Sequence, residues 1–309
     1  MRVLVTGAGG NLGRAVVPAL VDGGHQPVLF DFRRVDTDQE FVEGDVRDAS
    51  AVARAVADVE VVVHAAALHG IHLENWSVED FWSINVTGTF NVYQAARDAG
   101  VQHVVLGSSM VVYGDLGGGD DAWQVVDEQS PLRPTNLYGL TKVLCEDIAR
   151  YHALAGAVST VALRLGMFVP ETFERYGFRL LFGGVDDRDV AQSVLRALSH
   201  RPAEGFDAYN IMADSGLAAA DVLQLQTEVG DVLDQRWPGT SALLVERDLN
   251  LDELVWGRRI YPVDHAKNVL GYRPQYGFDS FLQALRQRDT SHYPYAEEPW
   301  WGVQRPAGA

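Results

Sequence analysis

A tyrosine, a lysine and a serine in this chain have the types and spacing needed for acid–base chemistry on an alcohol. Tyr138 and Lys142 lie four residues apart in a segment that reads as a helix, so their side chains would share one face. A phenol with a pKa near ~10 is a poor base at neutral pH, but a nearby ammonium favours the phenolate. Ser109 follows an apolar run and is suited to hydrogen-bond the oxygen of the reacting alcohol or carbonyl. These three residues are the predicted catalytic set.

A Tyr-x-x-x-Lys pair alone arises often by chance, and the N-terminus supplies the context that it needs. Val3–Val5 reads as a buried strand, and the segment Asn11–Leu20 is compatible with a helix. Between and just inside them lie Gly7, Gly10 and Gly13. Glycines let the backbone turn tightly and approach phosphates, and the start of a helix offers unpaired N–H groups. The stretch therefore predicts a site for the pyrophosphate of a dinucleotide.

The next predicted strand ends in a carboxylate that would choose the cofactor. The strand Pro27–Phe30 leads into Asp31, at the distance from Gly7 expected for the acid that binds the adenosine ribose. A carboxylate there accepts hydrogen bonds from the ribose diol and repels a 2′-phosphate. We therefore expect NAD rather than NADP, although Arg33 and Arg34 could weaken the preference.

Composition excludes several classes of partner. The 309 residues carry a formal charge of −17, which argues against nucleic acid or an anionic membrane surface as a partner. The single cysteine, Cys145, excludes an internal disulfide and suits a reducing compartment. No apolar run approaches the length of a membrane span, and the N-terminus reads as a structural strand. We expect a soluble cytoplasmic protein.

The order of predicted elements sets the fold class. Strands and helices alternate through Leu165, which predicts an α/β protein with a Rossmann-type doubly wound parallel sheet. Residues 1–169 would form the NAD-binding domain. Residues 170–309 would form mainly a small substrate-binding portion, with segments that return to the sheet. The longest helices are predicted at Phe81–Ala99, Tyr138–Ala155, Asp187–Ser199 and Ala220–Leu233. The aromatic tail from His292 could pack over a neighbour, close the site or be an ordered tail.

Three histidines lie close together after the fourth predicted strand. His64 ends that strand, and a hydrogen-bonded structural role fits it better than a ligand role. His69 and His72 lie on the following loop, at the carboxyl side of the sheet, where we expect contact with the substrate. No cysteine or carboxylate completes a metal-binding set, so no metal site is predicted.

The ordered set of motifs resembles the extended branch of the short-chain dehydrogenase/reductase superfamily, the NAD-dependent epimerase/dehydratases. The resemblance runs along nearly the whole chain. Beyond the glycine loop and the Tyr138 motif, it includes Ser108–Gly114, Tyr261–Asp264 and Leu270–Pro274. It implies Ser109 as the catalytic hydroxyl, Tyr138 as the acid/base and Lys142 as its helper. It also implies a homodimer built on the helices that carry Asn85 and Tyr138.

The same resemblance implies which residues contact NAD. These are Gly7, Gly10, Asn11, Leu12, Gly13, Asp31, Asp45, Val46, Ala65, Ala66, Asn85, Tyr138, Lys142 and Pro170. Asn85 would act as a supporting residue, and Asp45 and Val46 would lie at the adenine ring.

Two departures from the family pattern narrow the substrate. Sugar-nucleotide dehydratases carry an Asp-Glu pair where this chain has Met110-Val111, so dehydration lacks its acid and base. The segment Pro170–Asp186 is short, which leaves little chain to enclose a nucleotide. The stretch from Arg164 to Glu171 partly resembles uronate dehydrogenases. The candidate substrate contacts are His69, Ser109, Met110, Met167, Arg175 and Arg179.

These observations predict an NAD-dependent oxidoreductase that transfers hydride at a secondary alcohol or carbonyl of a small polar substrate, a sugar or a sugar acid. The nearest alternative is a nucleotide-sugar epimerase, in which NAD stays bound and the hydride returns to the other face. An alternative of another class is a non-catalytic NAD-sensing protein. The intact Ser109, Tyr138 and Lys142 set argues against it.

Overall fold

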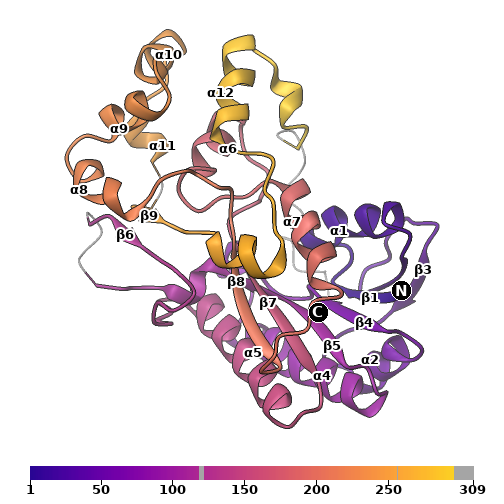
Figure 1. The fold of residues 1–309 in the computed structure, drawn as a ribbon. Coiled ribbons are helices and arrows are strands. Elements are labelled where there is room, and N and C mark those ends of the chain that lie inside the picture. Colours follow the sequence, from indigo (N-terminus) through magenta and orange to yellow (C-terminus); the bar gives the residue numbers. More distant parts are fainter. Residues whose placement is uncertain (118–121, 256, 296–309) are drawn as a thin grey trace.

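A seven-stranded parallel sheet forms the centre of the molecule (Figure 1). The computed structural model describes residues 1–117, 122–255 and 257–295. The strand order is β3-β2-β1-β4-β5-β7-β8, and every neighbouring pair is parallel. The strands are β1 (Arg2–Thr6), β2 (Gln26–Asp31), β3 (Glu40–Glu43), β4 (Val61–His64), β5 (His103–Ser109), β7 (Ser159–Leu165) and β8 (Phe206–Ile211). The predicted doubly wound sheet is confirmed.

Helices cover both faces of this sheet, and alternate residues of each strand supply the two cores. On one face, Val3 and Val5 pack with residues of α1 (Asn11–Asp22) and α7 (Asp187–Ala197). On the other face, Leu4 packs with residues of the remaining sheet helices. Those helices are α2 (Ala49–Val56), α4 (Gly88–Asp98) and α5 (Leu137–Leu154). Burial on both faces explains why the strands read as continuous apolar runs.

The order of the strands creates a crevice at one end of the sheet. The chain runs outward from β1 through β2 to β3, and β4 then returns to the other side of β1. In such sheets ligands bind outside the carboxyl ends of the strands where the order reverses. The fold therefore places the candidate site at the ends of β1 and β4.

A further apolar cluster lies mainly in the C-terminal part of the chain. It is built largely from aromatic side chains, among them Phe178, Phe182, Phe278 and Phe281. Its helices are α6 (Phe173–Arg179), α8 (Val222–Leu225), α9 (Val229–Arg236), α10 (Thr240–Glu246), α11 (Leu251–Leu254) and α12 (Phe278–Gln287). A short parallel pair of strands, β6 (Gln124–Val125) and β9 (Arg259–Ile260), lies beside them. In Figure 1 these elements lie above the main sheet.

Two predicted helices differ from the structure. The segment Ala220–Leu233 is not one helix: α8 ends at Leu225 and α9 begins at Val229. The Thr227 hydroxyl there bonds the carbonyl of Gln224, an alternative to the helical ladder. The segment Phe81–Ala99 is helical throughout, but it begins with a short helix α3 (Val78–Phe81) and a π-helical turn η2 (Trp82–Thr87). Such a turn inserts an extra residue, which hydrophobic spacing alone does not reveal.

The described part of the aromatic tail packs on its own chain. The ring of Tyr293 stacks on that of Tyr176 in α6, with centroids 3.8 Å apart and planes 8° from parallel. Tyr293 is buried, and its hydroxyl donates to the carbonyl of Val169 at 3.4 Å. The residues after 295 lie outside the described part. Of the three roles left open for the tail, an ordered tail fits its start, which packs on its own chain.

Candidate active site

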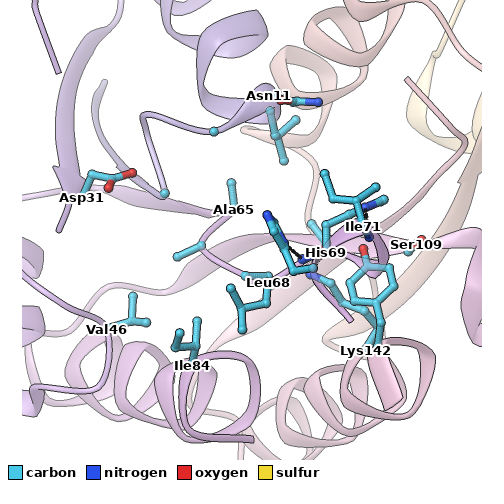
Figure 2. A pocket seen from close by; sticks show the side chains of 18 of the residues that line it. Asn11, Asp31, Val46, Ala65, Leu68, His69, Ile71, Ile84, Ser109 and Lys142 are labelled. Atoms are coloured by element: carbon cyan, nitrogen blue, oxygen red, sulfur yellow. Dashed lines mark hydrogen bonds between the residues drawn. The ribbon is translucent and has the colours of Figure 1, made fainter. Parts of the chain in front are cut away.

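A cavity of about 330 Å³ opens at the carboxyl ends of the central strands (Figure 2). Most of the predicted NAD contacts line it: Gly7, Gly10, Asn11, Leu12, Asp31, Asp45, Val46, Ala65, Ala66, Tyr138 and Lys142. Gly13, Asn85 and Pro170 do not line it. Figure 2 shows Asp31 and Val46 at one end and Ser109 and Lys142 at the other. The cavity thus joins the predicted adenosine end to the predicted chemical end.

The three glycines of the first loop have different tasks. Gly7 has a φ of +66°, and a Cβ there would lie 2.6 Å from the Cα of Ala66. A Cβ at Gly13 would collide with the backbone of Ala8, so Gly13 lets α1 pack closely on the loop. Gly10 lines the cavity and precedes α1 without a side-chain cap. The first-turn N–H groups of α1 therefore have no capping side chain, which fits a phosphate ligand.

Asp31 is held at the adenosine end by backbone donors. One carboxylate oxygen accepts from the N–H of Gly9 at 2.9 Å, and the other from the N–H of Arg33 at 2.9 Å. The side chain is buried at the end of β2 but lines the cavity. Each oxygen retains acceptor capacity for a ribose hydroxyl. Arg33 and Arg47 also line this end, and Arg47 forms an ion pair with Asp45 at 2.6 Å.

The structure brings together the three predicted catalytic side chains. Ser109 is the last residue of β5, and Tyr138 and Lys142 lie on the first turns of α5, which Asn136 caps. The Ser109 hydroxyl hydrogen-bonds the Tyr138 phenol. Lys142 Nζ donates to the carbonyl of Gly107 at 2.6 Å and lies 5.9 Å from the centre of the Tyr138 ring.

Burial is the main influence on the pKa values of Tyr138 and Lys142. It raises the pKa of Tyr138 above its usual range, and the bond to Ser109 opposes the rise only in part. It also lowers the pKa of Lys142, against the attraction of Cys145 and Glu146. The sequence argument expected Lys142 to lower the pKa of Tyr138. Burial is instead the largest influence on the pKa of Tyr138, and it favours the neutral phenol. A cationic nicotinamide ring is the further charge that would favour the phenolate.

Asn85 supports the site from behind the cavity wall. Its side-chain oxygen accepts from the N–H of Leu68 at 2.7 Å, and its nitrogen donates to the carbonyl of Leu68 at 3.0 Å. The same nitrogen donates to the Thr141 hydroxyl at 2.9 Å. Asn85 therefore fixes the loop after β4 to the helix that carries Tyr138. The π-helical turn η2 places Asn85 there.

A buried charged network behind Ser109 was not among the predicted site residues. Glu146 on α5 accepts from the Ser108 hydroxyl at 2.7 Å and pairs with Arg164 on β7 at 2.9 Å. Burial alone would raise the pKa of Glu146, but the hydrogen bonds and charge of Arg164 more than offset it, so this pKa is lowered. Ser108 and Arg164 are direct partners in the sheet register. The available signal was an arginine within the apolar run of residues 161–165.

The histidines after β4 divide as their positions indicate. His64 is buried, with Nδ1 at 2.7 Å from the Thr6 hydroxyl and Nε2 at 2.9 Å from that of Thr89. Burial lowers the pKa of His64 to about 3, so it is a neutral structural residue. His69 and His72 both line the cavity. Among the residues that the structure describes, no group of three or more metal-ligating side chains converges.

Three of the predicted substrate contacts, Met167, Arg175 and Arg179, do not line this cavity. Arg175 is exposed on α6 and lines neither cavity described here. Arg179 is buried instead, where it pairs with Glu171 at 3.4 Å and donates to the carbonyl of Val169 at 2.8 Å. Met167 is half-buried and lines neither cavity.

A second cavity has a volume of about 280 Å³. Met110, which follows Ser109, lines it together with Tyr261. Arg258 and Arg259, from the segment around β9, also line it. The arginines that line this cavity are therefore these two and not Arg175 and Arg179 of α6. Arg259 donates to the carbonyl of Gly114. Sequence reasoning missed both arginines because the contact joins segments far apart in the chain.

Comparison with known proteins bears on this site. The family model described as the NAD dependent epimerase/dehydratase family matches residues 3–176, more than half of the chain. A uronate dehydrogenase of Pseudomonas syringae pv. tomato is 31% identical over 201 residues, covering 64% of this chain and 69% of the relative. A UDP-glucose 4-epimerase of Lactobacillus helveticus is 31% identical over 172 residues (53% and 51%). An L-arabinose 1-dehydrogenase (NAD(P)(+)) of Haloferax volcanii is 31% identical over 174 residues (53% and 66%).

A solved structure supports the fold. A short-chain dehydrogenase/reductase superfamily protein from Agrobacterium tumefaciens, crystallised with bound NAD, matches with a TM-score of 0.68 and 24% identity, covering 94% of this chain and 97% of that one. The match confirms the predicted fold class. The family match confirms the predicted family, its NAD cofactor and the assignment as an enzyme. The chain belongs to the NAD-dependent epimerase/dehydratase family.

Proposed function

We propose that this enzyme oxidises the C1 hydroxyl of an aldose or a uronic acid to the lactone, with NAD⁺ as the oxidant. One observation carries the proposal. Ser109, Tyr138 and Lys142 lie at one end of a cavity whose other end holds Asp31. A dinucleotide that spans the cavity would bring its reactive ring beside the three side chains.

In the proposed mechanism Tyr138 takes the proton of the substrate hydroxyl. Ser109 hydrogen-bonds the same oxygen as it becomes a carbonyl, and it also bonds the Tyr138 phenol. Lys142 Nζ lies 5.9 Å from the centre of the Tyr138 ring and is placed to bind the nicotinamide ribose. Bound NAD⁺ supplies the hydride acceptor for the hydrogen on the carbon. The substrate thus loses one hydride and one proton.

The backbone contacts proposed for the cofactor follow from the cavity lining. Gly7, Gly10, Asn11 and Leu12 would face the pyrophosphate, and Asp31 the adenosine ribose. Asp45 and Val46 would lie against the adenine, and Ala65 and Ala66 against the middle of the molecule. Gly13 and Asn85 would act through packing and positioning, because neither lines the cavity.

Three observations favour a free sugar or sugar acid over a nucleotide sugar. The segment Pro170–Asp186 is short and folds into α6. Relatives of this chain include a uronate dehydrogenase and an arabinose 1-dehydrogenase. The second cavity beside Met110 carries Arg258 and Arg259, whose charge suits a carboxylate.

The test is a substrate panel with added NAD⁺, followed by the absorbance of NADH. It would contain D-glucuronate, D-galacturonate, L-arabinose, D-galactose and UDP-glucose. Production of NADH with a free sugar or uronate, and of the matching lactone, supports the proposal. Interconversion of UDP-glucose without net NADH would instead identify the alternative, an epimerase like the relative of Lactobacillus helveticus. Tight NAD binding with no turnover of any sugar would favour an NAD sensor.

We further propose a homodimer in the cytoplasm. The outer face of α4 and α5 exposes large apolar side chains, among them Phe90, Leu140, Tyr151 and Leu154. Exposed apolar patches of this kind mark interfaces.

No helix in the described part of the chain is long and apolar enough to span a membrane. The test of the dimer is separate. Light scattering on the wild type and on Tyr151→Glu should show a dimer and its loss; a monomeric wild type would contradict the dimer.

A further inference from the structure

His69 lies beside the reacting end of the cavity without a role in the mechanism above. Its ring and that of Tyr138 are in contact, with centroids 4.8 Å apart and planes tilted by 51°. Both side chains line the cavity, and Figure 2 shows His69 in the same part of it as Ser109 and Lys142. A bound substrate oxidised at Tyr138 would therefore approach the imidazole.

The backbone of His69 is fixed relative to the catalytic helix. The preceding residue, Leu68, is held through both its N–H and its carbonyl by Asn85. Asn85 is tied to Thr141, and the Thr141 hydroxyl donates to the carbonyl of Tyr138 at 2.8 Å. This chain of hydrogen bonds fixes the imidazole relative to Tyr138. A fixed imidazole can contact one particular atom of a bound substrate.

The ring of His69 is neutral at physiological pH. Burial lowers the pKa of His69 to about 4, and the nearby His72 and Lys142 lower it further in the same direction. Because the folded-state pKa is about 4, the neutral form prevails at every pH well above that value. A neutral imidazole has one N–H donor and one acceptor nitrogen.

The local turn decides which nitrogen carries the proton. His69 precedes the 3₁₀ turn η1 (Gly70–His72), and its Nδ1 accepts from the N–H of Ile71 at 3.4 Å. In return, Nδ1 of His72 accepts from the N–H of His69 at 2.8 Å. With Nδ1 used as an acceptor, the hydrogen of the neutral ring lies on Nε2. His69 thus offers a hydrogen-bond donor to the cavity.

We infer that His69 is a specificity-determining residue whose Nε2–H donates a hydrogen bond to the C2 oxygen of the sugar. The inference rests on the proposed oxidation at C1. The His69 and Tyr138 rings are in contact, so the two substrate oxygens that they hydrogen-bond must also be neighbours. The hydroxyls on C1 and C2 meet that requirement. An N–H donor at this place favours a substrate with a hydroxyl on C2. It disfavours a 2-deoxy sugar, which leaves the N–H unpaired. It also disfavours a protonated 2-amino sugar, which has no lone pair to accept the hydrogen bond.

The experiment compares a parent sugar with its 2-deoxy analogue in three proteins. The parent is whichever of D-galacturonate, D-glucuronate, L-arabinose or D-galactose the panel identifies. Wild type should prefer it in kcat/KM by about 10- to 100-fold, the range for a buried donor left unpaired. In His69→Leu, kcat/KM should fall by a similar factor on the parent and change little on the analogue. In His69→Gln, whose amide keeps a donor, much of the preference should remain.

Two controls separate this role from a structural one. His72→Gln alters the same turn from its other side, so it should move both substrates by the same factor and leave their ratio intact. NAD affinity, measured by quenching of protein fluorescence, should stay within about threefold in His69→Leu. Equal losses on parent and analogue in that variant would overturn the inference, as would a wild type that does not distinguish the two sugars. If no sugar reduces NAD⁺ at all, the proposed function fails first, and the inference falls with it.

Discussion

The buried carboxylate of Glu146 accepts a hydrogen bond of 2.7 Å from the hydroxyl of Ser108. Ser108 immediately precedes Ser109, which carries the proposed catalytic hydroxyl. The carboxylate is balanced by Arg164 in the strand next to β5. The hydrogen bond ties the end of β5 to α5, and Glu146 also pairs with Arg150 at 2.8 Å. Glu146 therefore helps to set the position of Ser109, although we place Glu146 away from the substrate.

The substitution Glu146→Gln should therefore destabilise the protein and misplace Ser109. It leaves Arg164 buried without its counter-charge, which costs about 3–5 kcal/mol of unfolding free energy. Urea unfolding measures that loss. The double change Glu146→Gln with Arg164→Met removes both charges and should recover part of the stability; a double variant as unstable as the single one would contradict the paired role.

Tyr138→Phe should remove most turnover while keeping the cofactor. Only the ionisable oxygen is lost, and acid–base catalysis is typically worth about 10²- to 10⁴-fold. We expect kcat to fall within that range and the Kd for NAD to stay nearly unchanged. Steady-state rates and a binding titration check both parts. Near-normal turnover on the true substrate would rule out the proposed base.

Asp31→Ala should shift cofactor choice towards NADP. The change removes repulsion of a 2′-phosphate, and Arg33 lies at the same end of the cavity. The ratio of Kd values for NADP and NAD should fall by about tenfold or more, the value of one charge-assisted contact. If the wild type already binds NADP more tightly than NAD, the role given to Asp31 is wrong.

Gly10→Ala and Gly13→Ala form a matched pair. At Gly10 the nearest atom to a new Cβ is the carbonyl oxygen of Gly7, at 3.3 Å, so the fold should tolerate alanine. At Gly13 the new atom meets the backbone of Ala8, so the thermal unfolding temperature should drop markedly. Gly10→Ala should instead lower NAD affinity with little change in unfolding temperature. Unchanged NAD binding in Gly10→Ala would show that the phosphates do not pass this point.

Acid should weaken the fold partly through His64. Its folded-state pKa of about 3 lies below the ordinary 6.5, so the unfolded chain binds a proton between these values and the folded one does not. The stability is complete above about pH 6.5 and falls as pH decreases, by ~1.4 kcal/mol for each pH unit in that window. In His64→Gln, unfolding free energies between pH 4.5 and 6 should lose this slope. An unchanged slope would mean that another group governs it.

Sequence reasoning captured what local patterns encode. The apolar runs of the strands, the glycine spacing and the Tyr138–Lys142 spacing all depend on residues near one another in the chain, and the structure brings Ser109, Tyr138 and Lys142 together as expected. Arg175 and Arg179 line neither cavity, because the direction in which α6 presents its side chains depends on packing against α12. Arg258 and Arg259 were missed for a similar reason: they reach the second cavity only through tertiary contacts.

The cavity crosses the point where the order of the strands reverses. Its adenosine end rests on β2, and its chemical end rests on β5 and α5. A ligand that fills it holds the two halves of the sheet together and binds only when both are folded. By mass action the resistance of the enzyme to unfolding then rises with free dinucleotide, by RT ln(1 + [L]/Kd). The nucleotide pool of the cell thus becomes part of what keeps this protein folded.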